Sequence, residues 1–202
     1  MSLFQATTFQ QIAEFGVHHV LGFLATYEEN YESDLASLNK RAKTGDEDED
    51  HLADEKYLLD QILALTLQLA AVALYRVVEI NTNKILRWRW PAAYIKAQDL
   101  YKADRLRAAL KRELGVDIKR LPGFVIIDEL RCANNAVKHE GMVSQALASY
   151  PGWTVGEALD PDLLKPLLDR AQLVIPTFVY AFAEAVVPKA NAKHVRFLGS
   201  PR

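Results

Sequence analysis

One short segment, Glu129 to Gly141, holds the side chains of this chain that are best suited to acid–base and phosphate chemistry. It reads Glu-Leu-Arg-Cys-Ala-Asn-Asn-Ala-Val-Lys-His-Glu-Gly. A histidine can move protons near neutral pH, and arginine, lysine and asparagine can bind phosphate oxygens by charge or by hydrogen bonds. On a helix, Asn135, Lys138 and His139 fall within about 80° of Arg131 around the axis. The segment therefore predicts one polar face that can hold a phosphate and transfer a proton.

The other side of the same helix is apolar. Leu130, Ala133 and Val137 turn away from the polar face, so we expect them to face a core. Asn134 and Asn135 are unusual between them, because asparagine is a poor helix former and both positions lie inside the expected helix. Their presence favours a functional reason for the segment.

An ordinary structural explanation covers the end of the segment. Lys138 and His139 complement the negative end of a helix dipole, and Gly141 is suited to cap the helix. That explanation leaves the two asparagines and the arginine unaccounted for. Both interpretations of the segment stay open at this point.

The segment resembles the signature of the HEPN superfamily of helical bundles, in which an Arg, commonly followed by Asn, precedes a His near the end of a helix. Asn135 and His139 match that Asn and that His. Asn134 stands where the Arg is expected, and the nearest arginine, Arg131, lies three residues upstream. The resemblance covers about a dozen residues. It implies a bundle that pairs as a homodimer, with the two signature helices lining a shared cleft.

The resemblance also implies an activity, because active members of that superfamily are metal-independent endoribonucleases of toxin–antitoxin and phage-defence systems. His139 is then expected to act as general acid/base on the ribose 2′-hydroxyl or the leaving oxygen. Arg131 or Lys138 is expected to stabilise the charge of the transition state, and Asn135 to orient His139 or hold the phosphate. RNA is the expected ligand, with no metal and no cofactor. A cognate antitoxin or nucleotidyltransferase is the protein partner that the resemblance implies.

Charge is distributed unevenly along the chain. Residues 1–60 hold 13 acidic side chains against four basic ones, whereas residues 84–120 hold 11 basic against four acidic. A basic stretch of this kind can bind the RNA backbone. Lys84, Arg87 and Arg105 are the candidate cations, and Asn134 is a further candidate contact. The alternative is that these charges only solvate helix surfaces.

The elements that position these residues are expected to be helices. Apolar residues recur at three- and four-residue steps between a few Pro and Gly positions, which predicts long helices over residues 8–43, 52–88, 93–114, 124–140 and 161–187. Pro91, Gly115 and Gly141 mark three of their ends. The expected fold is all-α, an up-and-down, HEPN-like bundle of about five long helices. One domain over residues 1–187 and a tail over 188–202 are expected.

Further features bear on location and burial. Cys132 is the single cysteine, so no internal disulfide is expected, and the first residues lack the pattern of a signal peptide. Residues 62–78 form the most apolar segment, interrupted by Gln68 and Arg76. We interpret it as a buried central helix and not as a membrane span, and we expect a cytoplasmic protein that makes no membrane contact. One histidine of the pair His18–His19 is expected in the core.

Three functions stay open on these grounds. The first is a HEPN-like protein that binds or cleaves RNA through the segment ending at His139. The second is a non-catalytic helical bundle that serves as an interaction module of the antitoxin type or in a structural role. The third is a sensor that binds a small molecule in a pocket between helices.

Overall fold

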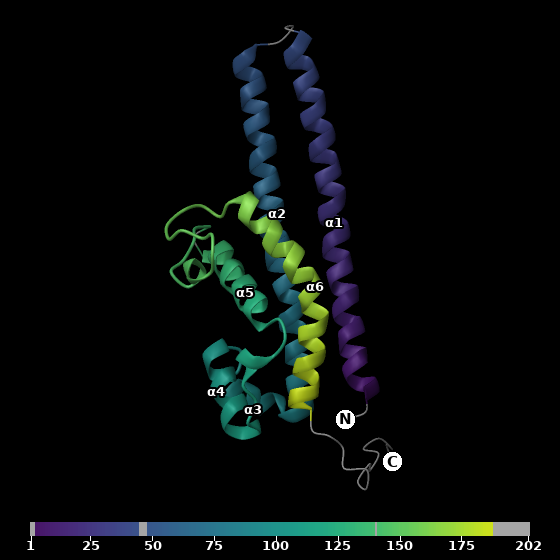
Figure 1. Ribbon diagram of the computed structural model, residues 1–202, viewed down its shortest axis with the longest axis vertical. Coiled ribbons are helices and arrows are strands. Elements are labelled where there is room, and N and C mark those ends of the chain that lie inside the picture. Colours follow the sequence, from purple (N-terminus) through teal and green to yellow (C-terminus); the bar gives the residue numbers. More distant parts are fainter. Residues whose placement is uncertain (1–2, 45–47, 140, 188–202) are drawn as a thin grey trace. The chain divides into compact units, whose positions relative to one another are not determined.

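The computed structural model describes residues 3–44, 48–139 and 141–187, and within these ranges the regular structure is helical (Figure 1). The all-α bundle predicted from the sequence is confirmed, and four of the five expected helices appear with ends shifted by a few residues. Between the described residues there is no strand, only one isolated antiparallel bridge from Met142 to Ala158. The elements are α1 (Leu3–Thr44), α2 (Glu49–Arg89), α3 (Ala92–Ala97), α4 (Ala103–Leu114), α5 (Phe124–His139) and α6 (Pro161–Val186), with 3₁₀ turns η1 (Ile118–Arg120) and η2 (Leu147–Ser149).

The third expected helix, over residues 93–114, was wrong, because the chain breaks it into α3 and α4. Asp99 adopts a left-handed φ of +51° just after α3. The amide of Leu100 donates to the carbonyl of Ile95, and the amide of Asp99 donates to that of Lys96. These two bonds form a Schellman motif, which closes a helix, and Ile95 and Leu100, the two positions that are commonly apolar in this motif, are both buried. The burial of Leu100 therefore ends α3.

Two turn glycines adopt positive φ but differ in their surroundings. Gly115, which caps α4, has a φ of +66°, and a Cβ there would meet nothing within 4 Å. Gly123 has a φ of +78°, and a Cβ there would lie 2.0 Å from Cγ1 of Val174. A side chain at Gly123 therefore carries both backbone strain and a clash, whereas one at Gly115 carries the strain alone.

We expect Gly115→Ala to lower the free energy of unfolding by about 1 kcal/mol, the usual cost of a left-handed alanine. Gly123→Ala should cost about 1 kcal/mol more, because Val174 must also move. Urea unfolding of the two variants beside the wild type measures this difference. Equal losses in the two variants would contradict a close approach of Val174 to the turn.

The chain divides into two compact units, each built from separate stretches of sequence. Of the described residues, the first contains 3–14, 78–124 and 174–187, and the second contains 15–44, 48–77, 125–139 and 141–173. The single domain expected over residues 1–187 stays a prediction. The expected tail, residues 188–202, lies outside the described residues.

The first unit contains the end of α2, the whole of α3 and α4, and the second half of α6. Phe178 and Phe182 stack on α6 with ring centroids 6.1 Å apart. Trp90 is buried, whereas Trp88 is exposed and meets Phe9 edge-on. Other buried residues of this unit include Ile85, Leu86, Ile95, Leu100, Leu110, Val179 and Ala183.

The second unit contains an antiparallel hairpin of α1 and α2, together with α5 from Val125 on and the first half of α6. The Tyr31 hydroxyl donates to Asp60 at 2.7 Å, and Arg41 forms an ion pair with Glu55 closer to the tip of the hairpin. Such polar contacts fix which turn of α1 faces which turn of α2. The buried residues of this unit include Val17, Leu24, Leu67, Ala71, Leu74, Ile127, Leu130, Leu164, Leu167 and Leu168.

Two expectations about burial in this unit were wrong. An 18-residue window of α2 reaches a mean hydropathy of 1.7 with at most two charged residues, yet only 28% of the window is buried. Leu67 and Ala71 face the core, but Leu65 and Leu69 on the other side are exposed. His18 and His19 are likewise both exposed. By length and composition α2 is able to cross a membrane, although one such helix is weak evidence that it does.

Candidate functional site

Helix α5 presents three of the expected functional side chains on one edge. Its inner face is fixed by Leu130 and Ala133, both fully buried as the apolar spacing predicted, whereas Val137, expected on the same face, is only half-buried. Asn135, Lys138 and His139 are exposed in its last turns. Four residues of helix rise about 6 Å, so a carboxamide, an ammonium and an imidazole share a patch the size of one nucleotide phosphate and its sugar.

The stretch after α5 is ordered by contacts back to itself. The amide of Val143 donates to the carbonyl of Glu157 at 2.8 Å, and the amide of Gly156 donates to the carbonyl of Val143 at 3.0 Å. Gly141 has a φ of +67°, and its amide donates to the carbonyl of Ala136, so it closes α5 as the sequence predicted. The amide of Leu159 also donates to the carbonyl of Gly141 at 3.2 Å, which joins the capped end of α5 to the stretch that follows it.

Arg131 pairs with Asp128 and not with the three exposed residues of the polar edge. Its Nε donates to Oδ1 of Asp128 at 2.7 Å, and its Nη2 lies 3.3 Å from Sγ of Cys132. Burial lowers the pKa of the guanidinium, but the bond to Asp128 acts in the opposite direction, and the pKa is raised above its ordinary value. Among the described residues, no hydrogen bond or ion pair joins Arg131 to Asn135, Lys138 or His139.

Asp128 also holds the stretch that follows α5. Its Oδ2 accepts a hydrogen bond from the hydroxyl of Tyr150 at 2.9 Å. Burial, and then this bond to a carboxylate, raise the pKa of the Tyr150 phenol well above its ordinary value. Asp128 thus joins Arg131 and Tyr150 in one polar cluster beside the edge of α5.

Asn134 is buried, with 1% of its surface exposed. Its Nδ2 donates to Oδ1 of Asn135 at 3.2 Å, while its own Oδ1 has no hydrogen-bond partner among the described residues. A side chain sealed in this way cannot itself meet a ligand in solvent. Its position suits a residue that orients the amide of Asn135, so the expected direct contact of Asn134 with a ligand does not fit its burial.

Sequence reasoning missed the role of Glu129. This carboxylate is 3% exposed and accepts hydrogen bonds from Nε1 of Trp153 at 3.0 Å and from Nη2 of Arg170 at 3.1 Å. It therefore ties α5 both to the stretch after it and to α6. The only signal in the sequence was a charged residue on the apolar side of α5, which demands a partner without identifying one.

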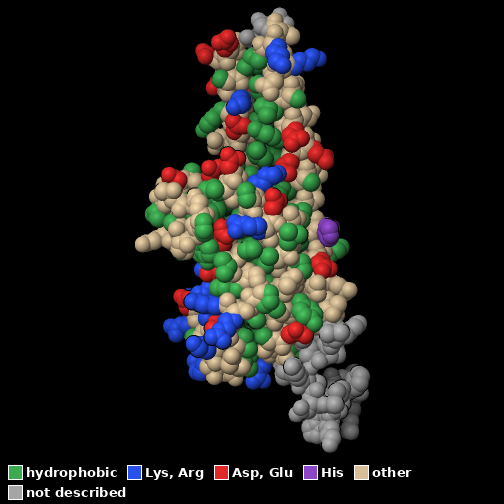
Figure 2. All heavy atoms as spheres, in the orientation of Figure 1, with side chains coloured by type: hydrophobic (Ala, Val, Ile, Leu, Met, Phe, Trp, Pro, Cys, Tyr) green, Lys and Arg blue, Asp and Glu red, His purple; other side chains and the backbone are tan. Residues whose placement is uncertain are grey.

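The candidate backbone-binding cations lie in the first unit, where Lys and Arg side chains gather over α3 and α4 (Figure 2). Lys84, Arg87 and Arg105 are all exposed, and no ion pair involves them among the described residues. Many of their neighbours are paired with acids instead. These three cations are therefore open to an anionic ligand.

A hollow of about 310 Å³ lies between α4 and η1 in the same unit. Lys111 and Lys119 on its wall are exposed, and Asp117, also on its wall, accepts a hydrogen bond from the amide of Lys119 and pairs with Arg120. The hollow thus offers two ammonium groups to an anion. No group of three or more His, Cys, Asp or Glu side chains within the described ranges is placed to hold a metal ion.

Comparison of the chain with protein-family models, with curated proteins and with solved structures found no match in any of the three. The likeness to the HEPN signature therefore stays a prediction from the segment that ends at His139.

Proposed function

We propose that this protein binds RNA and cleaves it without a metal ion, using the exposed edge of α5. One observation supports this above the others: Asn135, Lys138 and His139 reach solvent together on the last turns of a helix whose end is held in place. The resemblance of the same residues to the HEPN signature suggests the substrate. The proposal extends to a homodimer in the cytoplasm, paired with a cognate antitoxin or nucleotidyltransferase in toxin–antitoxin or phage-defence systems.

The chemistry follows from the three groups. His139 takes the proton from a ribose 2′-hydroxyl, and the resulting oxygen attacks the adjacent phosphorus. The bond from phosphorus to O2′ forms as the bond to O5′ breaks, and the leaving O5′ takes a proton from the imidazolium or from water. Lys138 offsets the charge that develops on the phosphate oxygens, and Asn135 donates a hydrogen bond to one of them.

Arg131 supports a second candidate function, a non-catalytic bundle that binds RNA or a partner. The guanidinium is held by Asp128, so its charge is already compensated within the protein. In a nuclease that used Arg131, RNA would have to compete with Asp128 for it. Lys138 is the better placed cation, because it is exposed and no ion pair involves it among the described residues.

The test of cleavage uses the full chain and a single-stranded RNA in the presence of EDTA. Fragments that end in a 2′,3′-cyclic phosphate are expected, because the attacking oxygen belongs to the same ribose. RNA that is retained but left intact would support the non-catalytic candidate. Failure of the protein either to retain or to cut RNA would remove both.

The salt dependence of RNA binding tests the basic residues separately. Lys84, Arg87 and Arg105 replaced together by Gln should flatten the slope of log affinity against log salt by about 2, because each lost phosphate contact to a single strand contributes about 0.7. Filter binding across a series of salt concentrations measures the slope.

A matched control removes three charges from the same stretch of the chain. Lys102, Arg112 and Arg120 are each paired with an acid, so their replacement by Gln should change the slope much less. Equal changes in the two triple variants would show that net charge matters and that no particular cations contact the backbone.

A further inference from the structure

One face of the α1–α2 hairpin in the second unit is apolar and open to solvent. We call it the hairpin face, and it is made by large side chains that are each between 44% and 67% exposed: Phe15, Phe23, Leu58, Ile62, Leu65 and Leu69. Hydrophobic side chains follow the hairpin toward its tip in Figure 2. Single exposed apolar residues are common, but a row of them on one face indicates an interaction surface.

The row on α2 has the spacing of a helix that packs against another helix. Leu58, Ile62, Leu65 and Leu69 follow each other at steps of four, three and four residues, the spacing of the core positions of a coiled coil. They cover about three turns, or roughly 16 Å, of one side of the helix. Beside Leu65 and Leu69 the opposite side of α2 is occupied by the core of its own unit, through Leu67, Ala71 and Leu74, so the row itself is left for a second binding partner.

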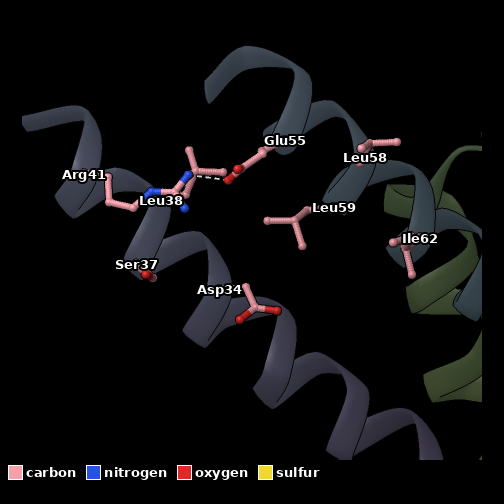
Figure 3. A pocket seen from close by; sticks show the side chains of 8 residues that line it. All are labelled: Asp34, Ser37, Leu38, Arg41, Glu55, Leu58, Leu59 and Ile62. Atoms are coloured by element: carbon pink, nitrogen blue, oxygen red, sulfur yellow. Dashed lines mark hydrogen bonds and ion pairs between the residues drawn. The ribbon is translucent and has the colours of Figure 1, made fainter. Parts of the chain in front are cut away.

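The face also has hollows at both ends of that row. One, of about 320 Å³, is walled by Leu58 and Ile62; Leu59 points across it toward α1, and the ion pair of Arg41 with Glu55 lies beside it (Figure 3). Its wall on α1 includes Asp34.

The other hollow, of about 290 Å³, lies beside Leu69. It is lined by Phe23 and by His19, and Phe15 rests edge-on against that histidine with ring centroids 4.3 Å apart. Leu65 stands between the two hollows. Ridges and hollows therefore alternate along one face.

We propose that the hairpin face is the interface between two copies of this chain, related by a two-fold axis beside Leu65. The α2 helices then run antiparallel, and side chains near Leu58 of one copy enter the hollow near Leu69 of the other. The two hairpins together form a four-helix bundle. This inference takes up the homodimer of the proposed function but assigns its interface to α1 and α2, and not to the α5 helices that the HEPN resemblance would place at a shared cleft. It does not depend on RNA chemistry, so the cleavage test and the test of the interface can fail separately.

The size of the face supports a second copy as its occupant. Six large side chains, each about half exposed and each presenting roughly 200 Å² when free, offer roughly 600 Å² of apolar surface. A stable interface buries about 800 Å² on each partner, so these residues supply most of it. Two-fold symmetry is also the commonest arrangement in which a surface of one subunit binds the same surface of an identical subunit.

Charge and burial argue against a lipid surface. Glu29, Glu32, Asp34 and Asp54 are exposed on the same two helices, and carboxylates are repelled by anionic lipid head groups. From Leu67 to Leu74 the inner side of α2 is covered by protein, so along that length only one of its faces is left to meet lipid. A second copy of the chain carries the same apolar row and can cover the face with protein, so no lipid is required to cover it.

The test compares two exposed leucines. Leu65→Glu places two like charges at the two-fold axis and should raise the dissociation constant of the dimer by about 100-fold or more. Leu173→Glu is the matched control, because Leu173 on α6 is 75% exposed but lies outside the hairpin face. Sedimentation equilibrium up to high micromolar concentration should give twice the 22.7 kDa of one chain for the wild type and the control, and one chain for Leu65→Glu.

A cross-link tests the symmetry independently of stability. Leu65→Cys should oxidise to a disulfide-linked dimer, because a residue on a two-fold axis meets its own copy, whereas Leu173→Cys should not. The wild type is the blank, since its single cysteine, Cys132, is buried. Far-UV circular dichroism establishes that each variant is folded before it is compared.

Three results would overturn the proposal. They are a wild type that stays a single chain at every concentration, a dimer that persists in folded Leu65→Glu, and an absence of the Leu65→Cys cross-link. A further experiment measures whether the protein co-sediments with vesicles that contain phosphatidylglycerol. Sedimentation of the wild type with them, lost in Leu65→Glu, would assign the face to lipid instead.

Discussion

Replacement of His139 by alanine is expected to slow RNA cleavage by about 10²–10⁴-fold, the usual contribution of a positioned acid/base. The imidazole is exposed at the end of α5, so its removal leaves the core unchanged. The thermal unfolding of the variant should therefore match that of the wild type. Single-turnover rates with a labelled RNA in EDTA measure the effect.

His18→Ala is the matched control for this experiment. His18 is also an exposed histidine on a helix of the same unit, but it lies on α1 and not on α5. Its loss should leave the rate unchanged. Cleavage that continues at the full rate without His139, or that falls equally with either histidine, would show that the imidazole of His139 does not transfer the proton.

The second large effect is on stability. Glu129→Ala is expected to lower the free energy of unfolding by about 2–3 kcal/mol, because the buried indole N–H of Trp153 is left without an acceptor. Arg170, the other partner, is half exposed and regains water when the carboxylate is removed. Guanidinium unfolding followed by tryptophan fluorescence measures the loss.

Two further variants show whether the loss of stability comes from the hydrogen bond between Glu129 and Trp153. Glu129→Gln keeps an oxygen acceptor for Trp153 and should lose less than the alanine variant. Glu157→Ala removes an exposed carboxylate from the same unit and should change stability by less than about 0.5 kcal/mol. A Glu129→Ala protein as stable as Glu157→Ala would mean that the buried carboxylate contributes little to the fold.

The helix ends were predictable where the backbone demands a particular residue. Pro91 cannot continue α2, and the left-handed positions after α4 and α5 are held by Gly115 and Gly141. These requirements are local, so they are visible in the sequence. The break before α4 was not visible, because Asp99 tolerates a left-handed φ without requiring it and the burial of Leu100 decides the matter.

Burial of α2 could not be predicted for a related reason. An apolar helix shows that its surface avoids water, but the pattern does not reveal which molecule covers each side. Leu67 is covered by the chain's own core and Leu65, two residues away, is not.

The candidate site was predictable in part. Exposure of Asn135, Lys138 and His139 on one edge follows from helix geometry alone. The pairing of Arg131 with Asp128 has a spacing of three residues and was open to inference, because such pairs face each other on a helix. The hydrogen bond from Tyr150 to Asp128 depends on how the stretch after α5 folds back, so no local sequence pattern predicts it.

The bonds of Glu129 also bear on the order in which the chain is made. A ribosome delivers this acid before Trp153, and well before Arg170, so a nascent chain holds the carboxylate for a time with neither partner present. Burial of a carboxyl group without hydrogen-bond partners is costly, so α5 cannot pack fully until the first turns of α6 have emerged. Completion of the second unit is thereby delayed until α6 has been synthesised.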